Sequence, residues 1–256
     1  MGPWERFARW YDLDQGGFDE DIPFYQALAQ RTGSPILELG CGTGRLVLAL
    51  ACAGHHVVGV DNQPAMLAVA QQKVQAAGPQ MSGRIRLLPA DMCDLDLPDR
   101  FRLAILAVNT FMHIADPQEQ GQILGCVFRH LAAGAMLALD LFPPHPDLLS
   151  PGAGEILLGK ALNDPATGNL VLKFVARQAD YARQILTTTF IYDEVDAEGQ
   201  VRRTAHSFPL RYLHRSEVEQ MLQAAGFAVE GLYGSYDLDP YDDASERMLF
   251  LARRPG

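Results

Sequence analysis

The sequence lacks several features that would assign a class at once. Its four cysteines form no Cys-x-x-Cys pair, so neither a metal site nor a disulfide framework is indicated. No apolar run reaches the ~20 residues that a membrane-spanning helix needs. The first residues, Met-Gly-Pro-Trp-Glu-Arg-Phe, lack the basic-then-apolar order of a signal peptide. We therefore expect a cytoplasmic protein with reduced cysteines, no metal and no membrane partner.

Positive charge is also scarce. The chain has 21 Lys and Arg against 31 Asp and Glu, a formal net charge of −10. Because phosphate binding depends on Lys and Arg, this balance argues against a broad nucleic-acid surface and favours a small-molecule partner. The 256 residues fit one large domain or one domain with an insertion, as a monomer or a homodimer.

A glycine-rich stretch dominates the first half of the chain. Residues 36 to 39 form a short apolar strand, Gly40, Gly42 and Gly44 follow directly, and a helical pattern begins near Leu46. A strand that turns into a helix through glycines leaves backbone N–H groups available and lets a ligand approach the main chain. This pattern predicts a nucleotide-type cofactor site.

Strands and helices alternate around this stretch. Helices are predicted over 44–53, from Pro64 to about 77 and from Pro117 to about 134, with Asn62 capping the second. Further strands are predicted over 55–61, 84–88, 101–108 and 135–141. This order predicts an α/β fold with a Rossmann-like, doubly wound, mostly parallel sheet.

The rhythm changes after residue 145. Residues 170–176, 185–193 and 201–213 read as strands without a long helix between them, and 196–199 as a hairpin turn. A helix over 215–225 and strands over 227–233 and 247–252 close the chain, with an exposed acidic loop over 235–245. We expect a seven-stranded core over 34–145 and 214–256, an antiparallel β insertion over 146–213 that covers the substrate, and an N-terminal helical lid over 1–33. The aromatic side chains of this lid lie in a stripe at helical spacing and would dock on the main domain (Trp4, Phe7, Trp10, Tyr11). A loop is expected after this helix, over 12–21.

Two cofactor classes use a glycine loop after the first strand. Dinucleotide dehydrogenases favour Gly-x-Gly-x-x-Gly, whereas here Arg45 occupies the place of the third glycine, and Glu38 precedes the loop. The stretch Glu38-Leu-Gly-Cys-Gly-Thr-Gly44, together with Val60-Asp61 and Ala90-Asp91-Met92, resembles the class I S-adenosylmethionine-dependent methyltransferases. The insertion resembles that of small-molecule N-methyltransferases.

The resemblance implies a cofactor, S-adenosyl-L-methionine with S-adenosyl-L-homocysteine as product, a closing antiparallel strand, and a set of contacts. Asp61 would accept both ribose hydroxyls, Asp91 and Met92 would meet the adenine, and backbone at Val108 and Asn109 would meet the methionine ammonium. The complete predicted cofactor set is Glu38, Gly40, Cys41, Gly42, Gly44, Asp61, Asn62, Met66, Asp91, Met92, Val108 and Asn109.

Candidates for the substrate side are fewer. Methyl transfer from a sulfonium is an in-line displacement that needs alignment and exclusion of water more than a strong base. His113 is the candidate base or orienting residue, although a histidine bonded to a neighbouring loop explains it as well, and Tyr11 is the candidate lid residue. Phe111, His206 and Tyr212 are the candidate substrate contacts, with His214, Arg211 and Arg215 as further possibilities.

The sequence therefore predicts a methyltransferase acting on a small soluble acceptor, with an amine nitrogen favoured. Two alternatives remain at this point. One is a nicotinamide-dependent oxidoreductase that shares the Rossmann-like fold, and the other is a non-catalytic module that binds S-adenosylmethionine.

Overall fold

The computed structural model describes residues 3–15, 17–149 and 155–256, without the side chains of residues 3–6. The chain divides into two compact units. One unit comprises Phe18–Pro143 with Leu213–Gly256, and the other comprises Met1–Gly17 with Pro144–Tyr212.

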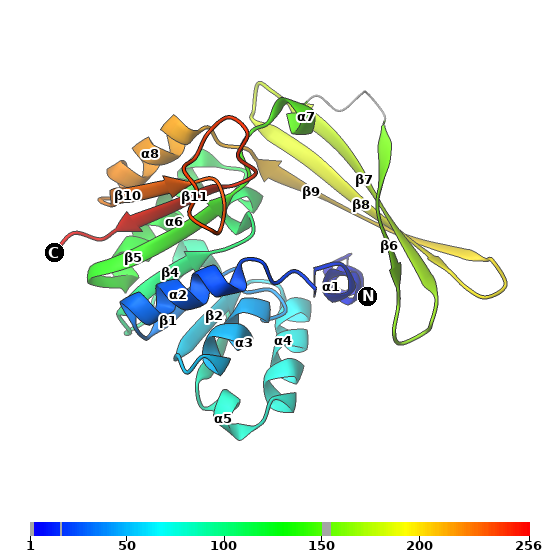
Figure 1. Cartoon of the computed structure of the whole chain (residues 1–256), viewed down its shortest axis with the longest axis horizontal. Helices are drawn as coiled ribbons and strands as arrows, with labels where there is room; N and C mark the ends of the chain where they lie inside the picture. Colours follow the sequence, from blue (N-terminus) through cyan, green and yellow to red (C-terminus); the bar gives the residue numbers. More distant parts are fainter. Residues whose placement is uncertain (1–2, 16, 150–154) are drawn as a thin grey trace. The chain divides into compact units, whose positions relative to one another are not determined.

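The larger unit contains a seven-stranded sheet with the order β10-β11-β5-β4-β1-β2-β3 (Figure 1). β11 runs antiparallel to both of its neighbours, β5 and β10, and the pairs among β1 to β5 are parallel. The expected Rossmann-like sheet with an antiparallel last strand is therefore confirmed. The strands are β1 (Ile36–Leu39), β2 (Val57–Asp61), β3 (Ile85–Pro89), β4 (Phe101–Leu106), β5 (Leu131–Leu141), β10 (Ala228–Tyr233) and β11 (Met248–Arg253).

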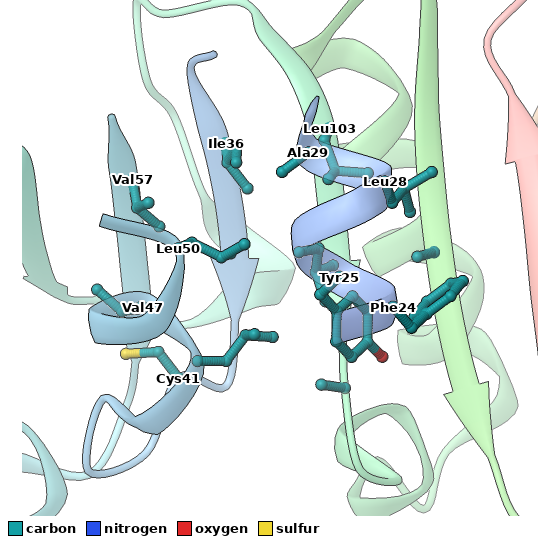
Figure 2. Close-up of a cluster of buried hydrophobic side chains, with 14 of the residues drawn as sticks. Phe24, Tyr25, Leu28, Ala29, Ile36, Cys41, Val47, Leu50, Val57 and Leu103 are labelled. Carbon is teal, nitrogen blue, oxygen red and sulfur yellow. The ribbon is translucent and has the colours of Figure 1, made fainter. Parts of the chain in front are cut away.

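Helices connect these strands and cover the sheet. They are α2 (Ile22–Thr32), α3 (Arg45–Cys52), α4 (Pro64–Ala76), α5 (Pro79–Ser82), α6 (Pro117–His130) and α8 (Arg215–Ala224), with short 3₁₀ turns η1 (Met92–Asp94) and η2 (Thr110–His113). Figure 2 shows Tyr25 and Leu28 of α2 facing a core that also receives Leu50 of α3 and Val57 of β2. The continuous burial of β1 and β2 is that of strands covered on both faces.

The second unit is built on a four-stranded antiparallel sheet in the order β6-β7-β8-β9. Its strands are β6 (Ile156–Asn163), β7 (Leu170–Asp180), β8 (Ile185–Val195) and β9 (Val201–Arg211), and its helices are α1 (Pro3–Gln15) and α7 (Pro146–Leu149). The predicted hairpin turn lies between β8 and β9, where Gly199 has φ of +79°. The predicted antiparallel insertion is confirmed, with β6 as a strand that the sequence did not indicate.

The aromatic stripe of α1 packs on this second sheet, which corrects the expectation that it docks on the main domain. Phe7 stacks on His206 of β9 with ring centroids 4.6 Å apart, and Trp10 stacks on Tyr192 of β8 at 5.7 Å. The helix also continues to Gln15, into the range expected to be a loop. Trp4, the first residue of the stripe, lies outside the described side chains.

A second boundary differs from the expected one. α6 ends at His130 and β5 begins at Leu131, four residues earlier than predicted, because Leu131 pairs with Phe101 of β4. The buried His130 ring accepts a hydrogen bond from Leu97 N at 3.0 Å, which fixes the end of the helix.

Candidate functional site

The glycine loop connects β1 to α3 with a backbone that other residues rarely adopt. Gly40, Gly42 and Gly44 have φ values of +71°, +53° and +81°. Gly44 is the left-handed residue from which α3 begins, and a Cβ on Gly40 would collide with the side chain of Thr110. Glycine is required here both by conformation and by the close approach of the loop to the end of β4.

Asp61, at the end of β2, reaches the glycine loop. Its Oδ2 accepts a hydrogen bond from Gly42 N at 2.8 Å, and its Oδ1 accepts one from Gln63 N at 2.8 Å. The second bond orders the turn before α4, whose N-cap residue is Gln63 and carries no side-chain cap. The predicted cap at Asn62 is therefore wrong, and Asn62 is exposed. Burial raises the pKa of Asp61, while its backbone hydrogen bonds oppose the shift. The carboxylate thus lies within one hydrogen bond of the loop.

Glu38 belongs to β1, just before the glycine loop, and is almost completely buried. Burial raises its pKa to about 8, an effect that Asp21 and Asp61 reinforce and that Arg45 and the Val47 N–H oppose. Within the described part of the chain, no group donates a hydrogen bond to its Oε2 atom. A buried carboxylate oxygen without a donor is costly unless a ligand or water satisfies it.

Arg45, the residue that replaces the third dinucleotide glycine, has a defined structural role. Its two Nη atoms bind the two carboxylate oxygens of the fully buried Asp21 at 2.6 Å each, and Nη1 also donates to the Phe18 carbonyl at 3.0 Å. The bidentate pair fixes the segment before α2 against the first turn of α3.

The end of β4 forms a strained turn. Val108 and Asn109 have φ values of +47° and +64°. Asparagine adopts a positive φ readily, but for the β-branched Val108 it is an outlier that costs about 1–3 kcal/mol. Asp140, at the end of β5, holds this turn: its Oδ2 accepts from Val108 N at 3.0 Å, and its carbonyl accepts from Asn109 N at 3.1 Å. Such strain persists where the surroundings fix it, and it is concentrated at functional sites.

The predicted adenine contacts lie on the loop after β3. Asp91 is exposed and caps η1, since its Oδ1 accepts from Cys93 N at 2.8 Å, and Met92 is half-buried. Met66 of α4 is buried. Cys41, which is part of the glycine loop, is also buried, and burial raises the pKa of its thiol. These positions remain predictions as cofactor contacts.

The substrate-side candidates are divided between the two units. His113 ends η2 on the larger unit and is exposed, whereas Phe111 beside it is fully buried, which is the position of a core residue. In the second unit, His206 is buried under Phe7, and burial lowers its pKa. Tyr212 is buried as well, and Tyr11 packs its half-buried ring edge-on against Phe7.

Several residues of the site were missed by sequence reasoning. The acidic loop over 235–245 was expected to be exposed, but Tyr236 donates its hydroxyl to Asp140 Oδ2 at 2.7 Å, and Arg247 lies 3.6 Å from Asp140 Oδ1. Asp21 was assigned to a loop and is buried. Contacts between residues far apart in the sequence leave no local pattern. The position of Asp140 at the end of a predicted strand was nevertheless a signal that could have marked it as a site residue.

The glycine requirement gives a direct prediction. Gly40→Ala should destabilise the protein by more than about 1 kcal/mol, since it adds a positive-φ penalty to a collision with Thr110. Thermal melting will measure this, with Gly54→Ala as the control. Gly54 also has a positive φ but has open space where the Cβ of an alanine would lie, so its loss should be smaller. Equal losses would show that the contact with Thr110 is unimportant.

Two observations bear on metals and membranes. The described residues contain no cluster of three or more His, Cys, Asp or Glu side chains suited to a metal ion. None of the helices that the structure describes has the length and apolar character needed to cross a membrane.

Comparisons with known proteins find similarity to methyltransferases. Residues 36–134 match the model of a methyltransferase domain. The chain is 28% identical over 222 residues to the cypemycin N-terminal methyltransferase of a Streptomyces species, covering 87% of this chain and 84% of that protein. It is 39% identical over 113 residues to the demethylmenaquinone methyltransferase of Thermus thermophilus, covering 43% of this chain and 48% of the relative.

Solved structures show the same fold. The methyltransferase CcbJ of Streptomyces caelestis aligns with a TM-score of 0.77 and 23% identity over 93% of this chain and 90% of its own. The sugar N-methyltransferase KedS8 of a Streptoalloteichus species aligns with a TM-score of 0.76 and 23% identity over 96% and 92%.

Proposed function

Because residues 36–134 match the model of a methyltransferase domain, we propose that the chain is a class I S-adenosylmethionine-dependent methyltransferase that methylates an amine nitrogen of a small soluble acceptor. The observation that carries the proposal is the bond from Gly42 N to Asp61 Oδ2, which joins the glycine loop to the acidic end of β2. The preference for nitrogen is supported by two similar proteins, one named an N-terminal methyltransferase and one a sugar N-methyltransferase.

The residues of the larger unit fit the cofactor. Asp61 offers two carboxylate oxygens to the ribose hydroxyls, and the loop around Gly42 presents backbone without side chains. The unsatisfied Oε2 of Glu38 suits a positively charged group, which the α-ammonium of the cofactor provides. Val108 and Asn109 directly precede Thr110, and the side chain of Thr110 lies against Gly40 of the same loop.

Methyl transfer to a neutral amine requires little acid–base catalysis from the protein. When bound, S-adenosylmethionine supplies an electrophilic methyl group for in-line displacement by the acceptor. The residues of the chain then align the acceptor and exclude water, and a neutral amine needs no strong base. The exposed His113 at the end of η2 is our candidate for receiving the proton. We propose the unit of α1 and the four-stranded sheet as the substrate cover, with Tyr11 as its contact.

The test is calorimetric titration with S-adenosylhomocysteine. Asp61→Ala should lower the affinity by about tenfold or more, because a charged hydrogen-bonding group is lost. Asp61→Asn should fall between the wild type and the alanine variant, since one acceptor oxygen remains. Asp94→Asn, which changes an exposed carboxylate at the end of η1, is the control and should bind like the wild type.

Absence of binding by the wild type, or equal binding by Asp61→Ala, would disprove the cofactor assignment. The acceptor class is tested separately with a labelled methyl donor and panels of amines, phenols, carboxylates and sugars. Transfer to phenols or carboxylates without transfer to amines would contradict the nitrogen assignment.

A further inference from the structure

The two backbone amides of the turn after β4 both donate to one residue outside the turn. Val108 N and Asn109 N are the two amides of the turn, and both donate to Asp140, one to Oδ2 at 3.0 Å and the other to the main-chain carbonyl at 3.1 Å. Asn109 Oδ1 accepts from Phe142 N at 2.7 Å, which closes the connection between the ends of β4 and β5. Two adjacent positive-φ residues other than glycine need such a clamp to remain in place.

Asp140 is itself oriented by two residues from the last loop of the chain. The Tyr236 hydroxyl donates to Oδ2 at 2.7 Å, and Arg247 Nη1 lies 3.6 Å from Oδ1. Arg247 stacks over the Tyr236 ring with its guanidinium carbon 5.1 Å from the centroid. Asp140 has no exposed surface, so these contacts are made out of water and are stronger for it.

The clamped turn lies against the glycine loop. Thr110, the residue after the turn, occupies the space that a side chain on Gly40 would need. A shift of Val108 and Asn109 would therefore move the surface on which the glycine loop rests.

Buried polar atoms without a hydrogen-bonding partner gather around the same place. In the described part of the chain these include Asp140 Oδ1, Glu38 Oε2 and the Tyr25 hydroxyl. Tyr25 lies beside Tyr236, the hydrogen-bond partner of Asp140, with ring centroids 6.4 Å apart, and the charges of Asp140 and Glu38 both contribute to the raised pKa of Tyr25. A group of unsatisfied polar atoms of this kind indicates that a polar ligand or water completes it.

We propose that Asp140 is a positioning residue, which fixes the left-handed turn Val108–Asn109 against the glycine loop and so sets the backbone that faces the amino-acid end of the cofactor. This inference rests on the proposed function, because it assigns the turn to the cofactor site. Tyr236 and Arg247 extend the effect, since they connect the orientation of Asp140 to the loop before β11.

The experiment compares Asp140→Ala with Asp140→Asn. The alanine variant loses the acceptor for Val108 N, and its affinity for S-adenosylhomocysteine should fall by about tenfold, as expected for the loss of a hydrogen bond to a charged group. The asparagine variant retains an acceptor oxygen and should bind much more like the wild type. In the absence of ligand, amide hydrogen exchange of the peptide over 107–112 should accelerate in Asp140→Ala and remain slow in Asp140→Asn.

A matched control separates positioning from a general loss of stability. Phe227→Leu weakens a distant contact with Phe128, whose ring centroid is 5.1 Å away, and should lower the melting temperature without changing ligand affinity or exchange over 107–112. Tyr236→Phe removes only one hydroxyl, so it tests the network in a variant that keeps its packing, and its affinity should fall measurably.

The outcomes are distinct. If the wild type binds and Asp140→Ala binds equally well, or if exchange over 107–112 is unchanged, the positioning role is disproved while the proposed function stands. Equal losses of affinity in the alanine and asparagine variants would also disprove it. If the wild type itself does not bind S-adenosylhomocysteine, both the proposed function and this inference fail.

Discussion

Replacing Glu38 with glutamine is expected to make the protein more stable than the wild type at alkaline pH and to weaken cofactor binding. The buried carboxyl has a pKa raised to about 8, chiefly by burial, with Asp21 and Asp61 adding to the effect and Arg45 opposing it. Ionisation of the wild type therefore requires an uncompensated charge in the core. Glutamine keeps the shape of the side chain and cannot ionise.

The direction of the pH effect follows from the raised pKa. In the unfolded chain the carboxyl loses its proton near its ordinary value of 4.5, whereas the folded protein keeps the proton up to about pH 8. The folded state then binds more protons than the unfolded state, and stability from this group falls as pH rises between these values, by about 1.4 kcal/mol per pH unit. Above pH 8 the loss is complete.

Urea denaturation at a series of pH values from about 5 to about 9 measures this effect as the difference between the two proteins. Stability of the wild type should decline relative to Glu38→Gln across the range, and Glu20→Gln, an exposed carboxylate of the same unit, should follow the wild type. Parallel curves for the wild type and Glu38→Gln would contradict the prediction. The variant should also bind S-adenosylhomocysteine more weakly at the alkaline end of the range, where the wild type presents a negative charge to the ammonium.

The sequence was most informative for residues whose role depends on their immediate neighbours in the chain. Gly40 and Gly44 were predicted from their spacing after a strand, and the structure shows the positive φ values that require glycine. Asp61 was predicted from its place at a strand end, and it does reach the loop. Asp140 also ends a strand, but its importance depends on Tyr236, 96 residues away, and no local pattern contains that contact.

The same reasoning explains which elements of the fold could be predicted from the sequence and which could not. β1, β2, β4 and the second half of β5 were predicted because burial on both faces leaves near-continuous apolar runs, whereas β3 is only partly buried. β6 was missed because its first six residues are all exposed, so the alternation that marks a half-buried strand is absent. The aromatic stripe of α1 predicted a docked helix, but the surface that receives it is formed by β8 and β9, far along the chain, as the pairing of Phe7 with His206 shows.

Replacing Asp14 with alanine is expected to detach α1 from the four-stranded sheet. Asp14 is buried and pairs with Lys173 of β7, which is buried as well, and it accepts a hydrogen bond from the Tyr192 hydroxyl at 3.2 Å. Burial lowers the pKa of Lys173, and the contact with Asp14 opposes that shift. Removing one partner of a buried ion pair leaves an uncompensated charge and costs about 3–5 kcal/mol.

A second lysine provides the matched control. Lys160 lies 3.1 Å from Asp14 Oδ1 but has a side chain that is 47% exposed, so Lys160→Met should cost less than about 1 kcal/mol. The double variant Asp14→Ala with Lys173→Met removes both buried charges, and it should recover most of the stability lost in Asp14→Ala.

Tryptophan fluorescence makes the site of the change visible, because both tryptophans of the chain, Trp4 and Trp10, belong to α1. Trp10 stacks on Tyr192 at 5.7 Å, so release of α1 exposes its ring to water and should shift the emission to longer wavelength. We expect that shift in Asp14→Ala at denaturant concentrations where the wild type and Lys160→Met retain their native emission. If Asp14→Ala keeps the native emission and loses little stability, aromatic packing on β8 and β9 holds the helix without help from the buried pair.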